Sequence, residues 1–405
     1  MKKLTMKTRF EVINSKRNEY LKAKRTQKTI IIDGLCLTTG LSRDRVKKLL
    51  SRNCREKRKR KAGSGRKLVY DHDLDIILLK LWELSDYASG KRFCAGINDL
   101  LDALIRFNEL AIDLKRENQL RNISPATVDR RLKTAREKYS LKGKSTTKPG
   151  TLLKKQIPIR LANQWDENQA GFMEIDLVAH CGETAAGEYI NTLNMTDIHT
   201  GWTETRAVRN KAQKHVFEAL QHIRTVIPFT LKGIDSDNGS EFINNHLFKY
   251  CDEENILFTR SRPYRKNDNC HVEQKNWHLV RRNLGYGRFE GQHTVDLMNH
   301  YYVLLSFRTN FFDTHFKLVH KHRDGAKIVK RYNGPKSPYR RLLEDPTISQ
   351  IDKDKLTEIY LSLNPIILKD DMIKLHKEII NRVVGLYNYQ LTMKGDHSSE
   401  LYFYE

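Results

Sequence analysis

The feature that most constrains the fold of this 405-residue chain is a series of short apolar segments between Gly171 and Leu284. Residues 171–180, 188–197 and 201–208 are each bounded by glycine or polar turn residues, which predicts three antiparallel strands. After them we expect, in order, an amphipathic helix over 211–226, a strand over 231–239, a helix from Phe242, a strand over 256–261 and a helix over 272–284. The pattern therefore predicts an α/β domain.

Three acids occupy positions in this series where a metal site needs carboxylates. Asp176 lies mid-strand between Ile175 and Leu177, where an unpaired carboxylate is costly unless a cation neutralises it. Asp237 ends the fourth strand, and Glu273 lies on the last helix. Taken singly, an Asp before Asn-Gly is usually a turn residue and a Glu on a basic helix is usually half of an ion pair. Their joint placement favours a metal site.

The order three strands, helix, strand, helix, strand, helix is that of the ribonuclease H-like fold. Three strings in it, MEIDLVAHCG, DSDNGSEF and RPYRKNDNCHVEQKNW, resemble the first-Asp strand, the second-Asp motif and the third-acid helix of DDE recombinases of the retroviral integrase superfamily. The resemblance is greater to the integrase-core transposases of bacterial insertion sequences and covers roughly 171–284. YNGPKSPYRRLL, residues 332–343, resembles the same transposases less specifically.

This resemblance implies that Asp176, Asp237 and Glu273 are the catalytic residues and bind two Mg²⁺ ions, for which Mn²⁺ can substitute. In such a site one ion activates water or a DNA 3′-hydroxyl and the other stabilises the leaving oxygen. The activity implied is that of a transposase, a Mg-dependent polynucleotidyl transferase. It binds the ends of a mobile element, nicks their 3′ ends by hydrolysis and joins them to target DNA by transesterification, without a covalent protein intermediate.

Several neighbouring residues compete for roles in this site. Asp235 is the closest rival for the second acid, but the family's Asp-Asn-Gly-x-Glu-Phe string aligns on Asp237, and Glu241 then becomes a supporting residue. Lys266, Asn267 and Asn269 precede the catalytic helix and are candidate contacts to DNA beside the scissile phosphate. An ordinary solvated loop is the alternative.

The sequence departs from retroviral integrases in two respects. It lacks an N-terminal His-His-Cys-Cys zinc domain, and it has Trp277 and Val280 where those enzymes place lysines after the catalytic Glu. A zinc site built from the pairs His180-Cys181 and Cys270-His271 is conceivable, with packing beside an active site as the alternative. The six cysteines include no CxxC pair, so free thiols are expected.

The charge balance indicates a polyanionic partner. Lys and Arg number 73 against 49 Asp and Glu, giving a formal charge of +24, and neutralising DNA phosphates releases condensed counterions. Double-stranded DNA, as element ends and as target, fits this charge best, although a protein that binds a ribosome or a membrane surface could carry the same net charge. The chain has no run of 18 apolar residues and no secretory h-region, so we expect a cytoplasmic, nucleoid-associated bacterial protein with no membrane partner.

The N-terminal part, residues 1–51, is expected to be a helix-turn-helix DNA-binding domain. Residues 28–50 predict two helices around a turn at Thr39-Gly40, the second opened by Ser42 and carrying Arg43, Arg45, Lys47 and Lys48 around an apolar face of Val46, Leu49 and Leu50. A helical bundle with a solvated basic face is the alternative. The basic linker 52–67 holds nine Lys or Arg, Arg58 and Arg60 among them, and suits a DNA groove or a solvated tether.

Residues 68–139 predict a second helical, helix-turn-helix DNA-binding domain. Ser124 is placed as N-cap and Pro125 as first helical residue, so that Val128 and Leu132 face inward while Arg130, Arg131 and Lys133 project outward. A linker over 140–165, the catalytic domain over 166–312 and a mixed basic C-terminal region over 313–405 complete the expected organisation. Helical periodicity appears near 355–363 and 372–384, and target-DNA binding or subunit contact is the hypothesis for this region.

Two other functions remain open from the sequence. One is a sequence-specific DNA-binding regulator with a degenerate core, and the other is a two-metal DNA nuclease that hydrolyses without joining. Pairing two element ends needs more than one catalytic site, so a dimer or tetramer assembled on DNA is expected. An accessory ATPase is a further open question.

Overall fold

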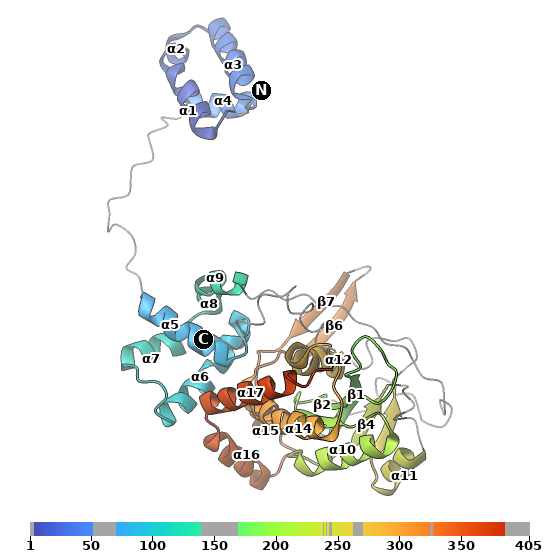
Figure 1. Cartoon of the computed structure of the whole chain (residues 1–405). Helices are drawn as coiled ribbons and strands as arrows, with labels where there is room; N and C mark the ends of the chain where they lie inside the picture. Colours follow the sequence, from blue (N-terminus) through green and yellow to red (C-terminus); the bar gives the residue numbers. More distant parts are fainter. Residues whose placement is uncertain are drawn as a thin grey trace. The chain divides into compact units, whose positions relative to one another are not determined.

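The computed structural model describes residues 4–51, 70–138, 169–237, 239, 241–242, 245–261, 270–324 and 327–384. These residues divide into two compact units, one ending at Val69 and the other starting at Tyr70 (Figure 1). The basic linker with Arg58 and Arg60, the linker 140–165, and Lys266, Asn267 and Asn269 lie outside the described residues.

The first unit consists of α1 (Met6–Ser15), α2 (Arg17–Lys22), α3 (Arg25–Thr39) and α4 (Arg43–Ser51). Gly40 ends α3 with a φ of 65°, in the left-handed region that glycine adopts without strain, and its N–H donates to the Cys36 carbonyl. Val46, Leu49 and Leu50 are buried as expected, with Ile13, Ile32 and Leu35 completing a small core. The two helices and the turn predicted for residues 28–50 are therefore present.

The second unit is organised on a mixed five-stranded sheet. Its strands are β1 (Phe172–Ala179), β2 (Asn191–Asp197), β3 (Thr203–Val208), β4 (Gly233–Ser236) and β5 (Leu257–Arg260), in the order β3-β2-β1-β4-β5. β1, β2 and β3 pair antiparallel, whereas β4 pairs parallel with both β1 and β5. The predicted ribonuclease H-like order of elements is confirmed.

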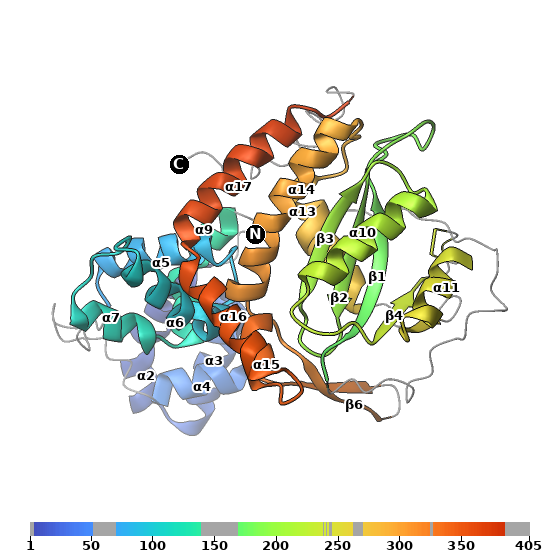
Figure 2. The same cartoon turned by 90° about the horizontal axis from the view of Figure 1, so that it is seen from below.

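Helices cover this sheet and extend it. α10 (Gln213–Val226) packs on β2 and β3 and lies across the sheet in Figure 2, while α11 (Asn245–Glu253) packs on β5. α12 (Cys270–Lys275) packs on β1 and β2 and continues without a break through the π-helical segment η1 (Asn276–Arg281) into α13 (Arg282–Leu284). α14 (Gln292–Phe307) packs on β3 and ends in a second π-helical segment, η2 (Arg308–Phe312).

Residues 70–138 form α5 (His72–Leu84), α6 (Gly90–Arg106), α7 (Leu114–Arg121), α8 (Pro125–Arg131) and α9 (Lys133–Lys138). They share one compact unit and one continuous core with the sheet. Ser124 caps α8, Pro125 follows it, and Val128 and Leu132 are buried, all as expected. Arg131 was expected to project outward, and this is wrong: its side chain is 18% exposed and pairs with Asp75.

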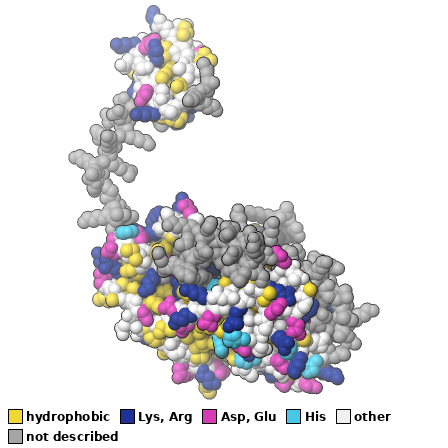
Figure 3. Space-filling view, viewed as in Figure 1, with side chains coloured by type: hydrophobic (Ala, Val, Ile, Leu, Met, Phe, Trp, Pro, Cys, Tyr) yellow, Lys and Arg dark blue, Asp and Glu magenta, His cyan; other side chains and the backbone are white. Residues whose placement is uncertain are grey.

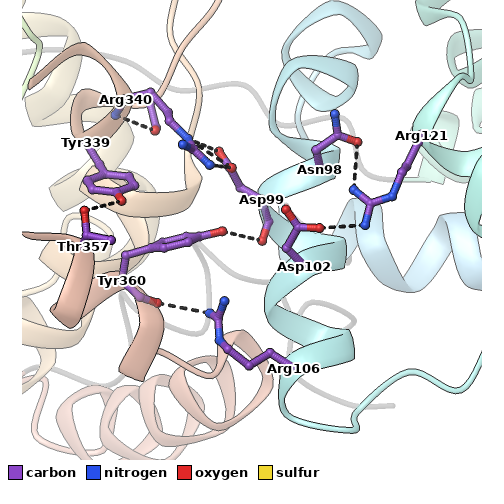
Figure 4. Close-up of polar contacts among 10 residues, drawn as sticks. Asn98, Asp99, Asp102, Arg106, Arg121, Tyr339, Arg340, Thr357 and Tyr360 are labelled. Atoms are coloured by element: carbon purple, nitrogen blue, oxygen red, sulfur yellow. Dashed lines mark hydrogen bonds and ion pairs between the residues drawn. The ribbon is translucent and has the colours of Figure 1, made fainter. Parts of the chain in front are cut away.

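The C-terminal region is mainly helical, with α15 (Pro338–Glu344), α16 (Gln350–Ser362) and α17 (Pro365–Ile380). Figure 4 shows how it joins α6. The Arg340 guanidinium binds the buried Asp99 carboxylate, with Nε 3.1 Å from Oδ1, and the Tyr360 hydroxyl donates to the Asp99 carbonyl at 3.0 Å. Arg106 donates to the Tyr360 carbonyl, and the Tyr339 and Tyr360 rings stack at 5.0 Å. Helices from residues 70–138 and 338–362 are thus tied together.

Between η2 and α15 the chain forms an antiparallel hairpin of β6 (Leu318–Asp324) and β7 (Lys327–Tyr332). Both views show this hairpin projecting from the body of the second unit (Figures 1 and 2). In the parts of the chain that the structure describes, no helix is both long and apolar enough to span a membrane.

Candidate active site

Asp176 is held in place by a short chain of side-chain amides. One carboxylate oxygen accepts the Leu177 N–H at 2.8 Å, and the other accepts the Asn276 Nδ2 at 2.5 Å. The Asn276 Oδ1 in turn accepts from Asn194 Nδ2 at 2.9 Å, and Asn194 is the residue opposite Asp176 in the β1–β2 ladder. The sheet therefore orients the Asp176 carboxylate through two asparagines, one of them three residues after Glu273.

Strand pairing brings Asp237 beside Asp176. In the parallel ladder between β1 and β4, Ile175 lies opposite Ser236, so the next residue on each strand is one of the two acids. Asp237 follows the last residue of β4, and its Oδ1 accepts the Gly239 N–H at 2.8 Å. Parallel strands end at the same edge of a sheet, so this register places both carboxylates at one edge.

Glu273 is brought to the same edge by a buried carboxylate that the sequence analysis missed. Glu174 lies two residues before Asp176 on β1 and is fully buried. It accepts the backbone N–H groups of His271 and Val272 at 2.9 and 3.1 Å, in the first turn of α12. A carboxylate at a helix N-terminus satisfies free N–H groups and complements the helix dipole. Glu174 therefore attaches the start of the helix that carries Glu273 to the strand that carries Asp176.

The negative charges of Asp237 and Glu273 both act on the Asp176 carboxyl group. The pKa of Asp176 is raised to about 7, first by burial and then by the negative charges of Asp237 and Glu273, while hydrogen bonds from Leu177 and Asn276 oppose the rise. Burial also raises the pKa of Asp237. A cation stabilises a cluster of carboxylates that disfavour each other's ionisation.

Asp235, the alternative candidate for the second acid, lies fully buried within β4, where its Oδ1 accepts a hydrogen bond from the Thr259 hydroxyl at 2.5 Å.

A second charged cluster involves the helix that carries Glu273. Asp86, in the turn between α5 and α6, contacts Arg282 at 2.7 Å, His278 at 3.6 Å and Arg308 at 3.6 Å. Burial opposes ionisation of Asp86, but Arg308 and Arg282 hold its pKa below the ordinary value. Since His278 and Arg282 both follow Glu273 on one continuous helix, this cluster fixes that helix to residues 70–138.

Asp313 belongs to the same cluster. Among the described residues, Asp86, His278 and Asp313 each offer one atom that could bind a metal ion, and these three atoms lie within 4.8 Å of one another. Burial raises the pKa of Asp313 to about 6 and lowers that of His278 to about 3. The guanidinium groups of Arg282 and Arg308 already stand against these carboxylates, so we interpret the group as an ion network.

The residues predicted to contact DNA occupy different settings. Arg45 and Lys47 are exposed on α4, Arg43 is exposed but pairs with Asp33, and Arg130 is exposed at the end of α8.

Of the residues considered for a zinc site, His180 has a hydrogen-bonding partner in the structure. His180 is buried, its ring contacts the Thr192 hydroxyl at 2.8 Å, and burial lowers its pKa to about 3, whereas the Cys270 side chain lies outside the described part.

Comparison with known proteins identifies the central region. Residues 166–266 match the model of the integrase core domain, a range that includes Asp176 and Asp237. The chain is 34% identical over 342 residues to the "Uncharacterized protein y4rM" of Sinorhizobium fredii (strain NBRC 101917 / NGR234), covering 84% of this chain and 96% of that protein.

Two solved structures are also similar to part of the chain. The catalytic core domain of BIV integrase is 18% identical, with 43% of this chain and 94% of that chain covered and a TM-score of 0.29. The HTLV-2 integrase catalytic core domain in complex with magnesium is 12% identical, with 36% and 91% covered and a TM-score of 0.28.

Proposed function

We propose that this chain, which belongs to one family with the y4rM protein of Sinorhizobium fredii and carries an integrase core domain, is a DNA transposase. The integrase core domain by itself indicates an activity in DNA transposition or integration. The finer proposal is that the protein binds the ends of a mobile element, nicks their 3′ ends and joins those ends to target DNA.

The observation that carries this proposal is the register of β1 and β4. It sets Asp176 and Asp237 side by side at one edge of the sheet, and Glu273 contributes to the raised pKa of Asp176 from the adjoining helix. A carboxyl group whose pKa is raised by burial and by neighbouring acids, as that of Asp176 is, has a purpose if the acids hold metal ions. A regulator with a degenerate core would have no need to keep it.

The donor set fits Mg²⁺, which prefers carboxylate oxygens and phosphate-bridged sites. Asp176, Asp237 and Glu273 would hold two such ions, and their chemistry is to activate the attacking oxygen and to stabilise the leaving one. The chain itself supplies the orientation. Asn276 aims the Asp176 carboxylate, Glu174 secures the start of α12, and the Asp86 network secures the rest of that helix.

DNA binding would be shared among several basic surfaces. The exposed Arg45 and Lys47 on α4 are the proposed base- or phosphate-contacting residues of the first unit, and Arg130 is the proposed contact on α8. Arg43 and Arg131 would have to give up their pairing with Asp33 and Asp75 to bind phosphate, so we expect smaller contributions from them. A dimer or tetramer on DNA remains the proposed assembly.

A joining assay tests this function against the nuclease alternative. Purified protein is incubated with Mg²⁺ and a linear duplex of several hundred base pairs taken from the DNA that flanks its gene, together with a supercoiled plasmid as target. A transposase yields duplex joined covalently to the plasmid. Free 3′ ends without joined product would favour a nuclease, and intact DNA bound by the protein would favour a regulator.

A further inference from the structure

The β6–β7 hairpin has the composition of a surface for a polyanion. Residues 317–332 contain six Lys or Arg and two His against the single acid Asp324. Among the side chains that the structure describes, His320, His322, Lys330 and Arg331 are exposed.

The hairpin cannot be stabilised by its own packing. Within the described ranges its two strands pair only with each other, which leaves each with an open edge there, and an isolated two-stranded hairpin is at best marginally stable in water. His320, and not an acid, lies opposite Arg331 in the ladder, so Arg331 has no acidic residue directly across the strands. Val319 and Tyr332 are 67% and 53% exposed. Both the charge and the apolar area would be relieved by a bound partner.

The base of the hairpin, in contrast, is firmly attached. His315 and Lys336 exchange backbone hydrogen bonds of 2.9 and 3.2 Å, and the Lys317 N–H donates to Asn333 Oδ1 at 2.8 Å. Arg341 donates to the His315 carbonyl at 2.7 Å. An arm with a fixed base and an unsupported, basic, projecting end is suited to enter a groove.

The base also contacts the catalytic helix directly. Lys275 Nζ lies 3.1 Å from His315 Nε2, and Lys275 is two residues after Glu273. The position of the hairpin is thereby linked to that of the catalytic acid.

We propose that the β6–β7 hairpin is a DNA-binding arm that inserts into the major groove of a duplex held at the active site. A two-stranded ribbon fits the major groove, and its Lys and Arg side chains would meet phosphates along the groove walls. Val319 would contact base edges or sugars. This inference rests on the proposed function, because it takes duplex DNA as the substrate of the carboxylate site.

Salt-dependent binding tests the arm. The double variant Lys330→Ala/Arg331→Ala is compared with wild type by fluorescence anisotropy on a random 30-base-pair duplex, without divalent ions, between 50 and 200 mM salt. Losing two phosphate contacts lowers the slope of log K against log salt by about 1.8 and weakens binding on the order of tenfold at low salt. The control Lys374→Ala/Lys377→Ala removes the same charge from exposed positions on α17 and should change the slope by less than half as much.

A crosslinking pair keeps the inference testable if the double variant is poorly folded. Val319→Cys and Ile351→Cys introduce thiols at positions 67% and 68% exposed, on the arm and on α16 respectively. Each is mixed with a duplex carrying a disulfide tether on a cytosine in the major groove, with wild type as the background. Preferential crosslinking of Val319→Cys supports the arm. Equal crosslinking of the two variants, or an unchanged salt slope in the double variant, overturns it.

These results separate the arm from the proposed function. If wild type joins the flanking duplex to plasmid while the double variant keeps its salt slope, the arm is wrong and the transposase stands. If wild type neither binds duplex DNA nor cuts it, the proposed function fails and the arm fails with it.

Discussion

Replacing Asp86 by Asn should destabilise the second unit more than any exposed charge substitution. Asp86 is 14% exposed and stands 2.7 Å from Arg282 and 3.6 Å from Arg308, each of which is 15% exposed. Its φ is +53°, a conformation that Asn tolerates as readily as Asp, so the substitution removes the charge without adding backbone strain. Arg282 would then lose the carboxylate that it binds, while Arg308 would keep Asp313 at 3.8 Å.

Removing one partner from a buried ion pair costs about 3–5 kcal/mol. We expect Asp86→Asn to lower the free energy of unfolding by that amount, measured by urea titration. Tryptophan fluorescence is a selective probe for this experiment, because all four tryptophans lie after residue 70 and none lies in the first unit. The signal therefore reports the unit that contains the sheet and the helix that carries Glu273.

Asp102→Asn is the matched control for this experiment. It removes the same charge from α6, where Asp102 is 47% exposed and pairs with Arg121 at 2.6 Å. An exposed pair of this kind contributes about 0–1 kcal/mol. Equal losses in the two variants, or a loss below about 1 kcal/mol for Asp86→Asn, would refute the reasoning that this network holds the helix that carries Glu273.

Two further predictions follow from buried polar groups. Burial raises the pKa of Glu204 from 4.5 to about 7. The protonated Glu204 side chain therefore contributes about 3 kcal/mol to the free energy of unfolding below pH 4.5, and this contribution is lost as the pH rises through 7. Glu204→Gln keeps an acceptor for the Trp202 and Ser306 donors, and its unfolding free energy should vary less between pH 5 and 8 than that of wild type; parallel curves would contradict this. Asn276→Ala releases the Asp176 carboxylate, and we expect Mg²⁺-dependent cleavage to fall at least about tenfold with DNA affinity unchanged, whereas unaltered cleavage would exclude a positioning role.

Much of the catalytic domain could be predicted because its information is local. Strands bounded by glycine and polar turns, and an Asp between Ile175 and Leu177, are visible over ten residues, and β1 to β5 appear in the predicted order. That β1 lies beside β4 with Ile175 opposite Ser236 depends on how the sheet assembles. The neighbouring position of β1 and β4 could be predicted only because the order of elements matches the ribonuclease H-like fold.

The residues that support the site were harder to predict because their partners are far away in sequence. Glu174 binds the start of a helix nearly 100 residues later, and Asn276 binds a carboxylate 100 residues earlier. Each is an ordinary polar residue in its own surroundings. The sequence of an amphipathic helix shows that one face is buried, but it does not show which element packs against that face. The link between Asp99 and Arg340, 241 residues apart, therefore escaped the sequence, as did the pairing of Arg131.

The β6–β7 hairpin could not be predicted from the sequence for a different reason. A strand is recognised by alternation between an apolar buried face and a polar exposed one. Among the side chains that the structure describes, none on β6 or β7 belongs to a hydrophobic core, and basic residues interrupt the apolar ones along the sequence. The sequence therefore predicts only a mixed basic region here.

Cleavage by variants of the three acids tests the central claim most directly. A labelled duplex from the DNA flanking the gene is incubated in Mg²⁺ with wild type, Asp176→Asn, Asp237→Asn and Glu273→Gln, and bound and cleaved fractions are measured on the same samples. Each substitution keeps the side chain's size and removes its charge. We predict cleavage by wild type alone, abolished by a chelator, with binding by all four proteins. Cleavage by any of the three variants at the wild-type rate would show that its acid does not hold the metal, and the proposed site would be wrong.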